Sequence, residues 1–170
     1  GLQTEGNFNN RIGLPLTLLG LRPEHRWAVL EMGMSEPGEI RALAAIARPR
    51  VRVITTVCEG HLEFFDSVDG IADAKGELFE DARPGDVLVH PQGAWFEPRL
   101  PRPAGASVAT FGGEGAAVEI RSIEDLGLAG TRSVLDMQGA ERVLELPLPG
   151  RHQVHNAAAA ATAALALGAT

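Results

Sequence analysis

HRWAVLEMGM (residues 25–34), GEIRALAAIARP (38–49) and RVRVITTVC (50–58) follow one another along the chain. The first segment is an apolar run that ends at a glycine, and it predicts a buried strand. The second predicts a helix that stops at a proline. The third is rich in β-branched residues and predicts the next strand. Alternation of strand and helix is typical of a parallel α/β sheet.

The only lysine of the chain, Lys75, lies in a second predicted helix, which starts after the N-cap residue Ser67. Ile71, Leu78 and Phe79 stand three or four residues from it, so Lys75 falls inside the apolar stripe of this helix. Three outcomes are open. The stem can extend to solvent, the amine can pair with a carboxylate, or burial can lower its pKa and favour the neutral form.

The rest of the chain predicts further strands and a last helix. Residues 86–91 predict another strand of the parallel sheet. Beyond a joint at 101–105, the short alternating segments in 106–148 predict a small appended antiparallel sheet. Residues 156–168 predict an apolar helix packed on the main sheet. The first five residues show no strand of their own. The expected fold class is α/β, a Rossmann-like, mostly parallel sheet flanked by helices.

Composition limits the classes of function. A length of 170 residues suits one domain, and a net charge of −7 argues against nucleic acid as the main partner. The single cysteine, Cys58, suits the cytoplasm. No apolar run is long enough for a membrane span, and the first residues do not form a signal peptide. The sequence has no Gly-rich turn ending in Gly-Lys-Ser/Thr.

Polar residues follow two of the predicted strands. Glu31 closes the run WAVL, and His61 lies three residues beyond VITTVC. If these strands are neighbours, both side chains share the crevice at the carboxyl ends of the sheet, and the Lys75 helix approaches the same place. The trio predicts a metal or phosphate site. The alternatives are that Glu31 caps a helix and that His61 is a surface residue.

Two asparagine-containing segments are candidate binding sites. Asn7, Asn9 and Asn10 precede an apolar helix-like run, and they form either a plain turn or a polar substrate site. Residues 148–160 lead from a glycine loop into a helix whose first turn is expected to carry Asn156. That amide either caps the helix or binds the edge of a purine.

Four segments in this order and spacing resemble the central ATP-binding domain of the Mur ligases. The segments are GNFNNRIGLPLTLL (6–19), EMGMSEPGEI (31–40), GHLEFFDSVDGIADAKGE (60–77) and LPGRHQVHNAAAA (148–160). Within the family the resemblance is strongest to the ligases that join D-alanyl-D-alanine to UDP-N-acetylmuramoyl-tripeptide. This resemblance implies a reaction with ATP and Mg²⁺, in which an acyl phosphate of the tripeptide is attacked by the dipeptide amine.

The resemblance also implies roles for individual residues. Glu31 and His61 would ligate magnesium, and Lys75 would become a carbamate that binds it as well. An arginine could not replace this lysine, because it stays protonated.

The remaining implied roles concern ATP and the peptide substrate. Asn156 would contact adenine, with Arg151 and His155 beside it. The residues implied to lie near the peptide substrate and the phosphates are Asn7, Asn9 and Asn10.

The chain departs from the family pattern in two respects. Met34, Ser35 and Glu36 stand where the family often has Ala-Asn-His, and the phosphate-binding loop expected before Gly1 is missing. We therefore expect residues 1–170 to be a middle domain without its N-terminal UDP-binding and C-terminal domains. The isolated chain is expected to have no ligase activity and at most weak affinity for ATP.

Other functions are compatible with these residues. One is a different Mur-type ligase, or a folylpolyglutamate or cyanophycin synthetase. Another is a non-catalytic binding domain without a phosphate loop. A third is a metal-dependent hydrolase that uses Glu31 and His61, whose metal binding would survive loss of Lys75.

Overall fold

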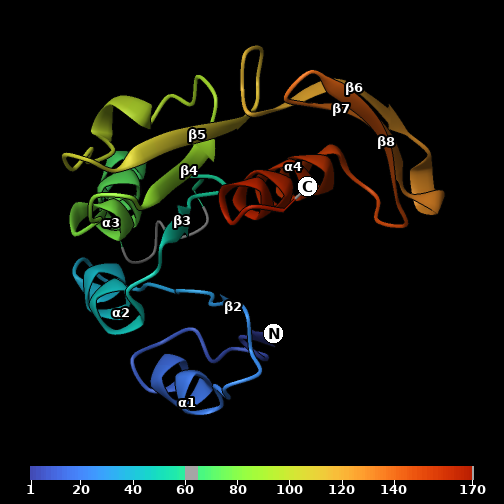
Figure 1. Cartoon of the computed structure of the whole chain (residues 1–170). Coiled ribbons are helices and arrows are strands. Elements are labelled where there is room, and N and C mark those ends of the chain that lie inside the picture. The colour runs from blue at the N-terminus through green and yellow to red at the C-terminus, as the bar shows by residue number, and fades with distance from the viewer. Residues whose placement is uncertain (60–64, 170) are drawn as a thin grey trace. The chain divides into compact units, whose positions relative to one another are not determined.

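The computed structural model describes residues 1–59 and 65–169 (Figure 1). Contacts within the chain divide it into two compact units. The first unit consists of residues 1–50, 57–83 and 99–104, and the second of 51–56, 84–98 and 105–170. His61 lies outside the described residues. Each of the other sequence-predicted site residues belongs to one of these two units.

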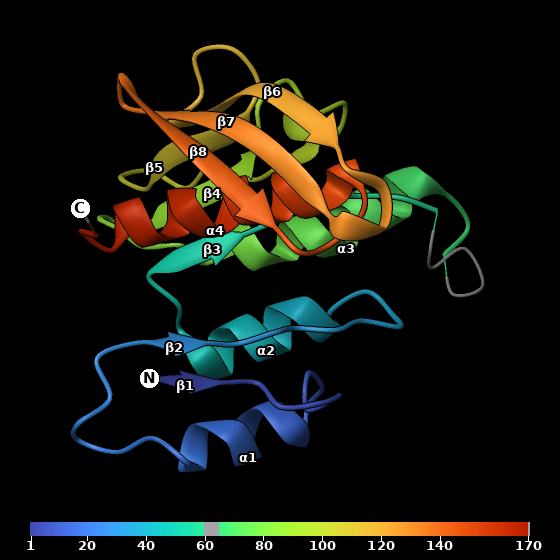
Figure 2. The same cartoon turned by 90° about the vertical axis from the view of Figure 1, so that its right-hand side faces the viewer.

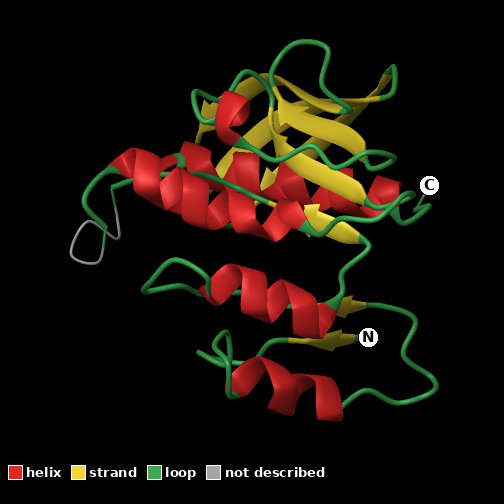
Figure 3. Cartoon of the chain, turned by 90° about the vertical axis from the view of Figure 1, so that its left-hand side faces the viewer, coloured by secondary structure: helices red, strands yellow, loops and turns green. Residues whose placement is uncertain are grey.

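In its described residues, the first unit contains three helices and a pair of very short strands. Its elements are β1 (Leu2–Gln3), α1 (Gly13–Leu19), β2 (Ala28–Val29), α2 (Glu39–Ala47) and α3 (Val68–Glu80). The two strands pair in parallel (Figure 3). The predicted N-cap of α3 is confirmed, because the Ser67 hydroxyl accepts a hydrogen bond of 3.1 Å from the amide of Gly70. The helix predicted over 38–49 is also confirmed as α2.

The expected buried strand over 25–34 is wrong. Only Ala28 and Val29 form strand, and the side chains of Trp27 and Val29 are 51% and 63% exposed. They pair with β1, in a segment where no strand was expected, so β2 lies in a different sheet from the segment 50–58. An apolar segment contains side chains that favour burial, but the sequence does not show which other element would pack against them.

The second unit is built on one six-stranded sheet. Its strands are β3 (Val51–Val53), β4 (Val87–Pro91), β5 (Ser107–Gly112), β6 (Val118–Asp125), β7 (Thr131–Met137) and β8 (Ala140–Leu146). They lie in sequence order across the sheet. Pairing is parallel from β3 to β6 and antiparallel from β6 to β8. Short 3₁₀ turns occur at Glu97–Arg99 and Gly127–Ala129.

The expected appended antiparallel sheet is therefore only partly correct. β5 joins the parallel strands, and β6 to β8 extend the same sheet as a meander. Alternation of polar and apolar residues predicts a strand with one wet face, but it does not determine the direction of the partner strand.

Helix α4 (Arg151–Ala166) covers one face of this sheet (Figure 2). Val154 and Ala158 on the helix pack with Val89, Phe111 and Leu135 of the strands. The expected packing on the main sheet is confirmed, but the helix starts five residues before the predicted 156. The reason is that Gly150, with φ +101°, ends the preceding loop, and the next residues already have helical backbone. Among the described residues, no helix has the length and apolar character that a membrane crossing requires.

Phe111 is the largest side chain of this core, and its removal tests whether the core holds the second unit together. We expect Phe111→Ala to lower the free energy of unfolding by about 3–5 kcal/mol, because it removes buried area and leaves a cavity. Leu128→Ala is the matched control, since Leu128 is almost fully exposed in the same unit and its loss should change stability by at most about 0.5 kcal/mol. Denaturant unfolding of both variants measures the difference, and equal effects would contradict this core assignment.

Candidate functional site

Glu31 and Asn9 meet side chain to side chain in the first unit. The Asn9 amide donates a hydrogen bond of 2.7 Å to Glu31 Oε1. The backbone around them is fixed as well, because the Gly33 amide donates to the Asn9 carbonyl at 2.7 Å and the Glu31 amide donates to Thr4 Oγ1 at 2.9 Å. A Cβ on Gly33 would lie 3.0 Å from the side chain of Asn9, so glycine permits this close approach.

This pair is a candidate cation site. Glu31 is exposed, and one of its oxygens is held by Asn9. A carboxylate oxygen is the kind of ligand that Mg²⁺ prefers. The structure thus brings together two of the sequence-predicted residues, and it does not bear out the alternative that Glu31 caps a neighbouring helix.

Asn10 has a structural role. Its Oδ1 accepts hydrogen bonds from the amides of Ile12 at 3.0 Å and Gly13 at 2.9 Å, at the start of α1. Two otherwise unsatisfied helix amides are thereby bonded. Asn7 is exposed in the turn before it. The three asparagines therefore differ: Asn9 contacts Glu31, Asn10 caps a helix, and Asn7 presents its side chain to solvent.

Lys75 occupies the half-buried position that the sequence predicted. Ile71 and Phe79, one turn away on either side, are buried. Burial lowers the pKa of the Lys75 amine below its ordinary value, and the nearby Cys58 thiol partly opposes this shift. A lower pKa raises the fraction of neutral amine, which is the nucleophilic form.

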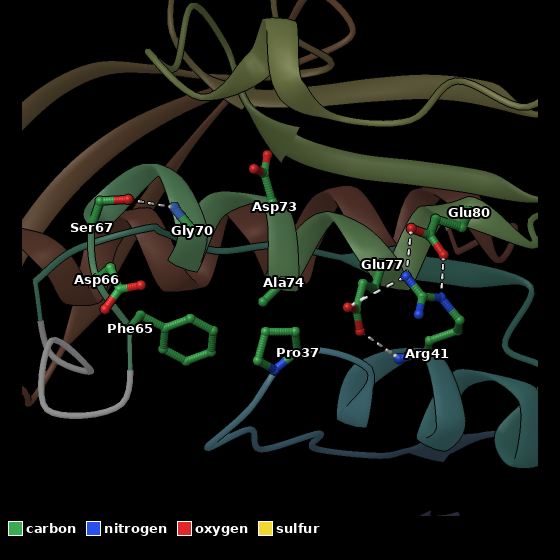
Figure 4. Close-up of a pocket in the computed structure, with 10 residues that line it drawn as sticks. All are labelled: Pro37, Arg41, Phe65, Asp66, Ser67, Gly70, Asp73, Ala74, Glu77 and Glu80. Atoms are coloured by element: carbon green, nitrogen blue, oxygen red, sulfur yellow. Dashed lines mark hydrogen bonds and ion pairs between the residues drawn. The ribbon is translucent and has the colours of Figure 1, made fainter.

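Two residues away, Glu77 joins α3 to α2 (Figure 4). Its carboxylate is buried, with 5% of the residue exposed. It accepts hydrogen bonds from the amides of Gly38 at 2.7 Å and Arg41 at 3.1 Å, which lie in the first turn of α2. The Arg41 guanidinium lies 3.5 Å from the same carboxylate and also pairs with Glu80. Glu77 thus caps α2 from a different helix, at the end where a negative charge is favoured.

Sequence reasoning missed this role of Glu77. The available signal was a carboxylate next to buried positions of a predicted helix, where an acid needs a partner. Gly76 has a packing reason, since a Cβ there would lie 3.3 Å from Pro101. In the segment AKGE (74–77), Gly76 therefore permits close packing and Glu77 caps α2. Lys75 is the candidate for chemistry.

A pocket of about 510 Å³ opens between α2 and α3 (Figure 4). Among the described residues, four carboxylates and one basic side chain, Arg41, line it. The acidic residues are Asp66, Asp73, Glu77 and Glu80. This excess of negative charge disfavours a phosphate ligand in this pocket.

The proposed nucleotide residues lie on α4 in the second unit. Arg151 is the first residue of the helix, and His155 follows one turn later. Burial lowers the pKa of His155, and the Arg151 charge lowers it further. Asn156 was expected in the first turn, but it is the sixth residue of the helix, so it is not a cap. Its amide donates to Gln153 Oε1 at 3.4 Å, which identifies Gln153 as a polar neighbour that sequence reasoning missed.

The expected metal trio is not complete in the part of the chain that the structure describes. Within residues 1–59 and 65–169, no group of three or more His, Cys, Asp and Glu side chains is placed to hold a metal ion. Unmodified lysine is not such a ligand, and the His61 prediction falls outside these residues. Glu31, supported by Asn9, is the described member that could hold a cation directly.

Comparison with known proteins identifies similar sequences. The profile of a family described as "Mur ligase middle domain" matches residues 1–164. The UDP-N-acetylmuramoyl-tripeptide–D-alanyl-D-alanine ligase of Bacillus subtilis is 36% identical over 98% of this chain, and that of Escherichia coli is 34% identical over 99%. These alignments cover 35% and 38% of the two relatives, so the chain spans little more than a third of their length.

Solved structures agree with the sequence comparison. MurF from Acinetobacter baumannii superimposes with a TM-score of 0.90 at 36% identity, over 99% of this chain and 37% of that one. MurF ligase from Thermotoga maritima in complex with ADP gives a TM-score of 0.84 at 28% identity, over 99% and 39% of the respective chains.

The capping role of Glu77 predicts a clear difference between two neighbouring carboxylates. We expect Glu77→Ala to lower the free energy of unfolding by about 2–4 kcal/mol, because it leaves two amides of α2 without their acceptor. Glu80→Ala removes an exposed partner of the same Arg41 and should cost at most about 1 kcal/mol. Denaturant unfolding compares the two, and an equal or larger loss for Glu80→Ala would rule out the cap.

The lowered pKa of Lys75 predicts a pH-dependent stability. The folded chain binds fewer protons at this amine than the unfolded chain does, between the depressed pKa and the ordinary value of 10.5. The cost of burying the charge is therefore present in full below the folded-state pKa and is relieved as the pH rises toward 10.5. Relative to Lys75→Met, the wild-type chain should gain stability as the pH rises toward 10.5. Unfolding titrations in CO₂-free buffer measure this, and a constant difference would contradict it.

Proposed function

The chain belongs to the Mur ligase family, whose middle domain it matches, and from that premise we propose that it is the central part of a tripeptide–D-alanyl-D-alanine ligase. The substrates would be UDP-N-acetylmuramoyl-tripeptide and D-alanyl-D-alanine. The observation that carries the proposal is the identity of 36% and 34%, over almost the whole chain, to two ligases of that name.

The proposed ligase is longer than this chain. Because residues 1–170 span little more than a third of those relatives, we propose that N- and C-terminal domains of the same polypeptide complete the enzyme. A UDP-linked substrate and a single cysteine suit a cytoplasmic enzyme.

The proposed reaction has two steps. The terminal carboxylate of the tripeptide attacks the γ-phosphorus of ATP, which releases ADP and leaves an acyl phosphate. The amine of D-alanyl-D-alanine then attacks the acyl carbon, so an amide forms and phosphate leaves with the bonding electrons. Activation is needed because a carboxylate is a poor electrophile. The first step brings anions together, so it depends on positive charge near the phosphates.

Glu31 is the described residue best suited to hold magnesium. Asn9 fixes the carboxylate by binding Oε1, so the other oxygen keeps a defined direction. His61 is proposed as a second ligand. When bound, Mg²⁺ would neutralise phosphate charge and orient the reacting oxygens.

Lys75 is proposed to act as a carbamate. Its burial favours the neutral amine, whose lone pair can attack carbon dioxide. A C–N bond forms as one C=O π bond of carbon dioxide becomes a C–O⁻, the nitrogen then loses one proton to water, and a carboxylate-like anion replaces the neutral amine. That group has the oxygen ligands that magnesium prefers.

The remaining residues are proposed to bind substrates. On α4, the carboxamide of Asn156 can bind the edge of adenine, and Arg151 and His155 lie on the adjacent side of the helix. Asn7 and Asn9 offer amide groups to the peptide or the phosphates. The Oδ1 of Asn10 is occupied at α1, so only its amino group is available for a substrate contact.

The test uses the full-length polypeptide that contains this chain. We expect phosphate release to require ATP and both proposed substrates. Glu31→Gln and Lys75→Arg should each lower kcat by about a hundredfold or more, because each removes an anion that would hold the metal. Glu80→Ala is the control and should retain activity.

Two results would overturn the proposal. One is a wild-type enzyme that accepts a different acid or amine in preference to the proposed pair. The other is full activity in both Glu31→Gln and Lys75→Arg, which would assign the chemistry to other residues.

A further inference from the structure

The turn between β5 and β6 is built from glycines at the carboxyl end of the parallel strands. Gly112, the last residue of β5, has φ +93°, and Gly115 has φ +77°. The turn is closed by a hydrogen bond of 2.9 Å from the Ala117 amide to the Thr110 carbonyl. Ligands of α/β sheets bind at this edge, so the residues that shape it are candidates for a role in binding.

The carboxyl end of the neighbouring strand β4 lies against this turn. The Gln92 amide, just beyond β4, donates a hydrogen bond of 2.8 Å to the Phe111 carbonyl. A Cβ on Gly113 would lie 3.0 Å from the side chain of Gln92. The two strand ends are therefore closely packed, and the Gly112 backbone has a fixed position.

Gly112 lies directly beside His155 of α4. A Cβ on Gly112 would be 3.4 Å from Nδ1 and 3.7 Å from Cε1 of the imidazole. A Cβ alone would thus be in ordinary van der Waals contact with the ring, so the atoms of a longer side chain that extend toward α4 would press against it. Gly115, in the same turn and with a similar backbone, would meet nothing within 4 Å.

We propose that Gly112 is a positioning residue of the nucleotide site, which lets His155 lie against the end of β5. The imidazole then has one defined placement beside Asn156, where a flat purine base can contact both side chains. Gly112 acts through His155 and does not itself react. This inference rests on the proposed ATP-dependent ligase function.

The experiment compares Gly112→Asn with Gly115→Asn in the full-length ligase. Both glycines have a positive φ, +93° at Gly112 and +77° at Gly115, and asparagine tolerates such a backbone better than most side chains, so the backbone cost is comparable in the two variants. We expect Gly112→Asn to raise KM for ATP about five- to tenfold, as expected for loss of about 1–1.4 kcal/mol of binding. KM for both peptide substrates and kcat should change little, and Gly115→Asn should match the wild type.

A double variant tests whether Gly112 acts through the histidine. If it does, adding Gly112→Asn to His155→Ala should raise KM for ATP no further than His155→Ala alone. Additive effects would overturn the proposal, as would equal effects of the two asparagine variants. If Gly112→Asn fails to fold, Gly112→Ser provides a smaller side chain with one atom beyond Cβ, and its KM for ATP should still exceed that of Gly115→Ser.

The wild-type measurement separates this inference from the proposed function. A wild-type enzyme without ATP-dependent ligation would contradict the function itself. An active wild-type enzyme whose KM for ATP is unchanged by Gly112→Asn would contradict only the role of Gly112.

Discussion

The buried carboxylate of Glu77 is the constraint on which the first unit depends. It accepts two amides at the start of α2, and its own burial is tolerated because these bonds and Arg41 satisfy its charge. The contact joins residues 36 or more positions apart in the sequence. This contact restrains the distance between α3 and α2 and also the rotation of α3 about its own axis. The reason is that the carboxylate must face both amides to accept a hydrogen bond from each.

The direction of Lys75 follows from this contact. Residues two apart on a helix point to nearly opposite sides, because each residue turns the helix by about 100°. With Glu77 held toward α2, Lys75 must project from another side of α3, between buried Ile71 and Phe79. Its half-burial, and therefore its lowered pKa, is a consequence of how α3 is anchored. The cap formed by Glu77 and the chemistry proposed for Lys75 therefore depend on the same helix orientation.

The sequence predicted the elements whose determinants are local. Ser67 caps α3 as expected, and the order β3, α3, β4 with parallel pairing agrees with the alternation of the pattern. The errors concern partners that are distant in sequence. The exposed β2 at Val29 and the parallel pairing of β5 both depend on which strand lies alongside. The role of Glu77 was missed for the same reason, because its partners lie on another helix.

In the candidate site, too, the sequence gives the residue types, whereas the contacts of each residue are known only from the structure. The sequence left open whether Asn7, Asn9 and Asn10 form a plain turn or a polar substrate site, and the structure shows a different use for each of them. Asn10 caps α1 and Asn9 holds Glu31, so two of the three amides already have intramolecular bonds. A side chain that orients a carboxylate still contributes to binding, because it reduces the freedom lost when a cation arrives. In the proposed site, Asn9 would therefore act mainly through Glu31, whereas Asn7, exposed in the turn, would be the asparagine free to meet a substrate directly.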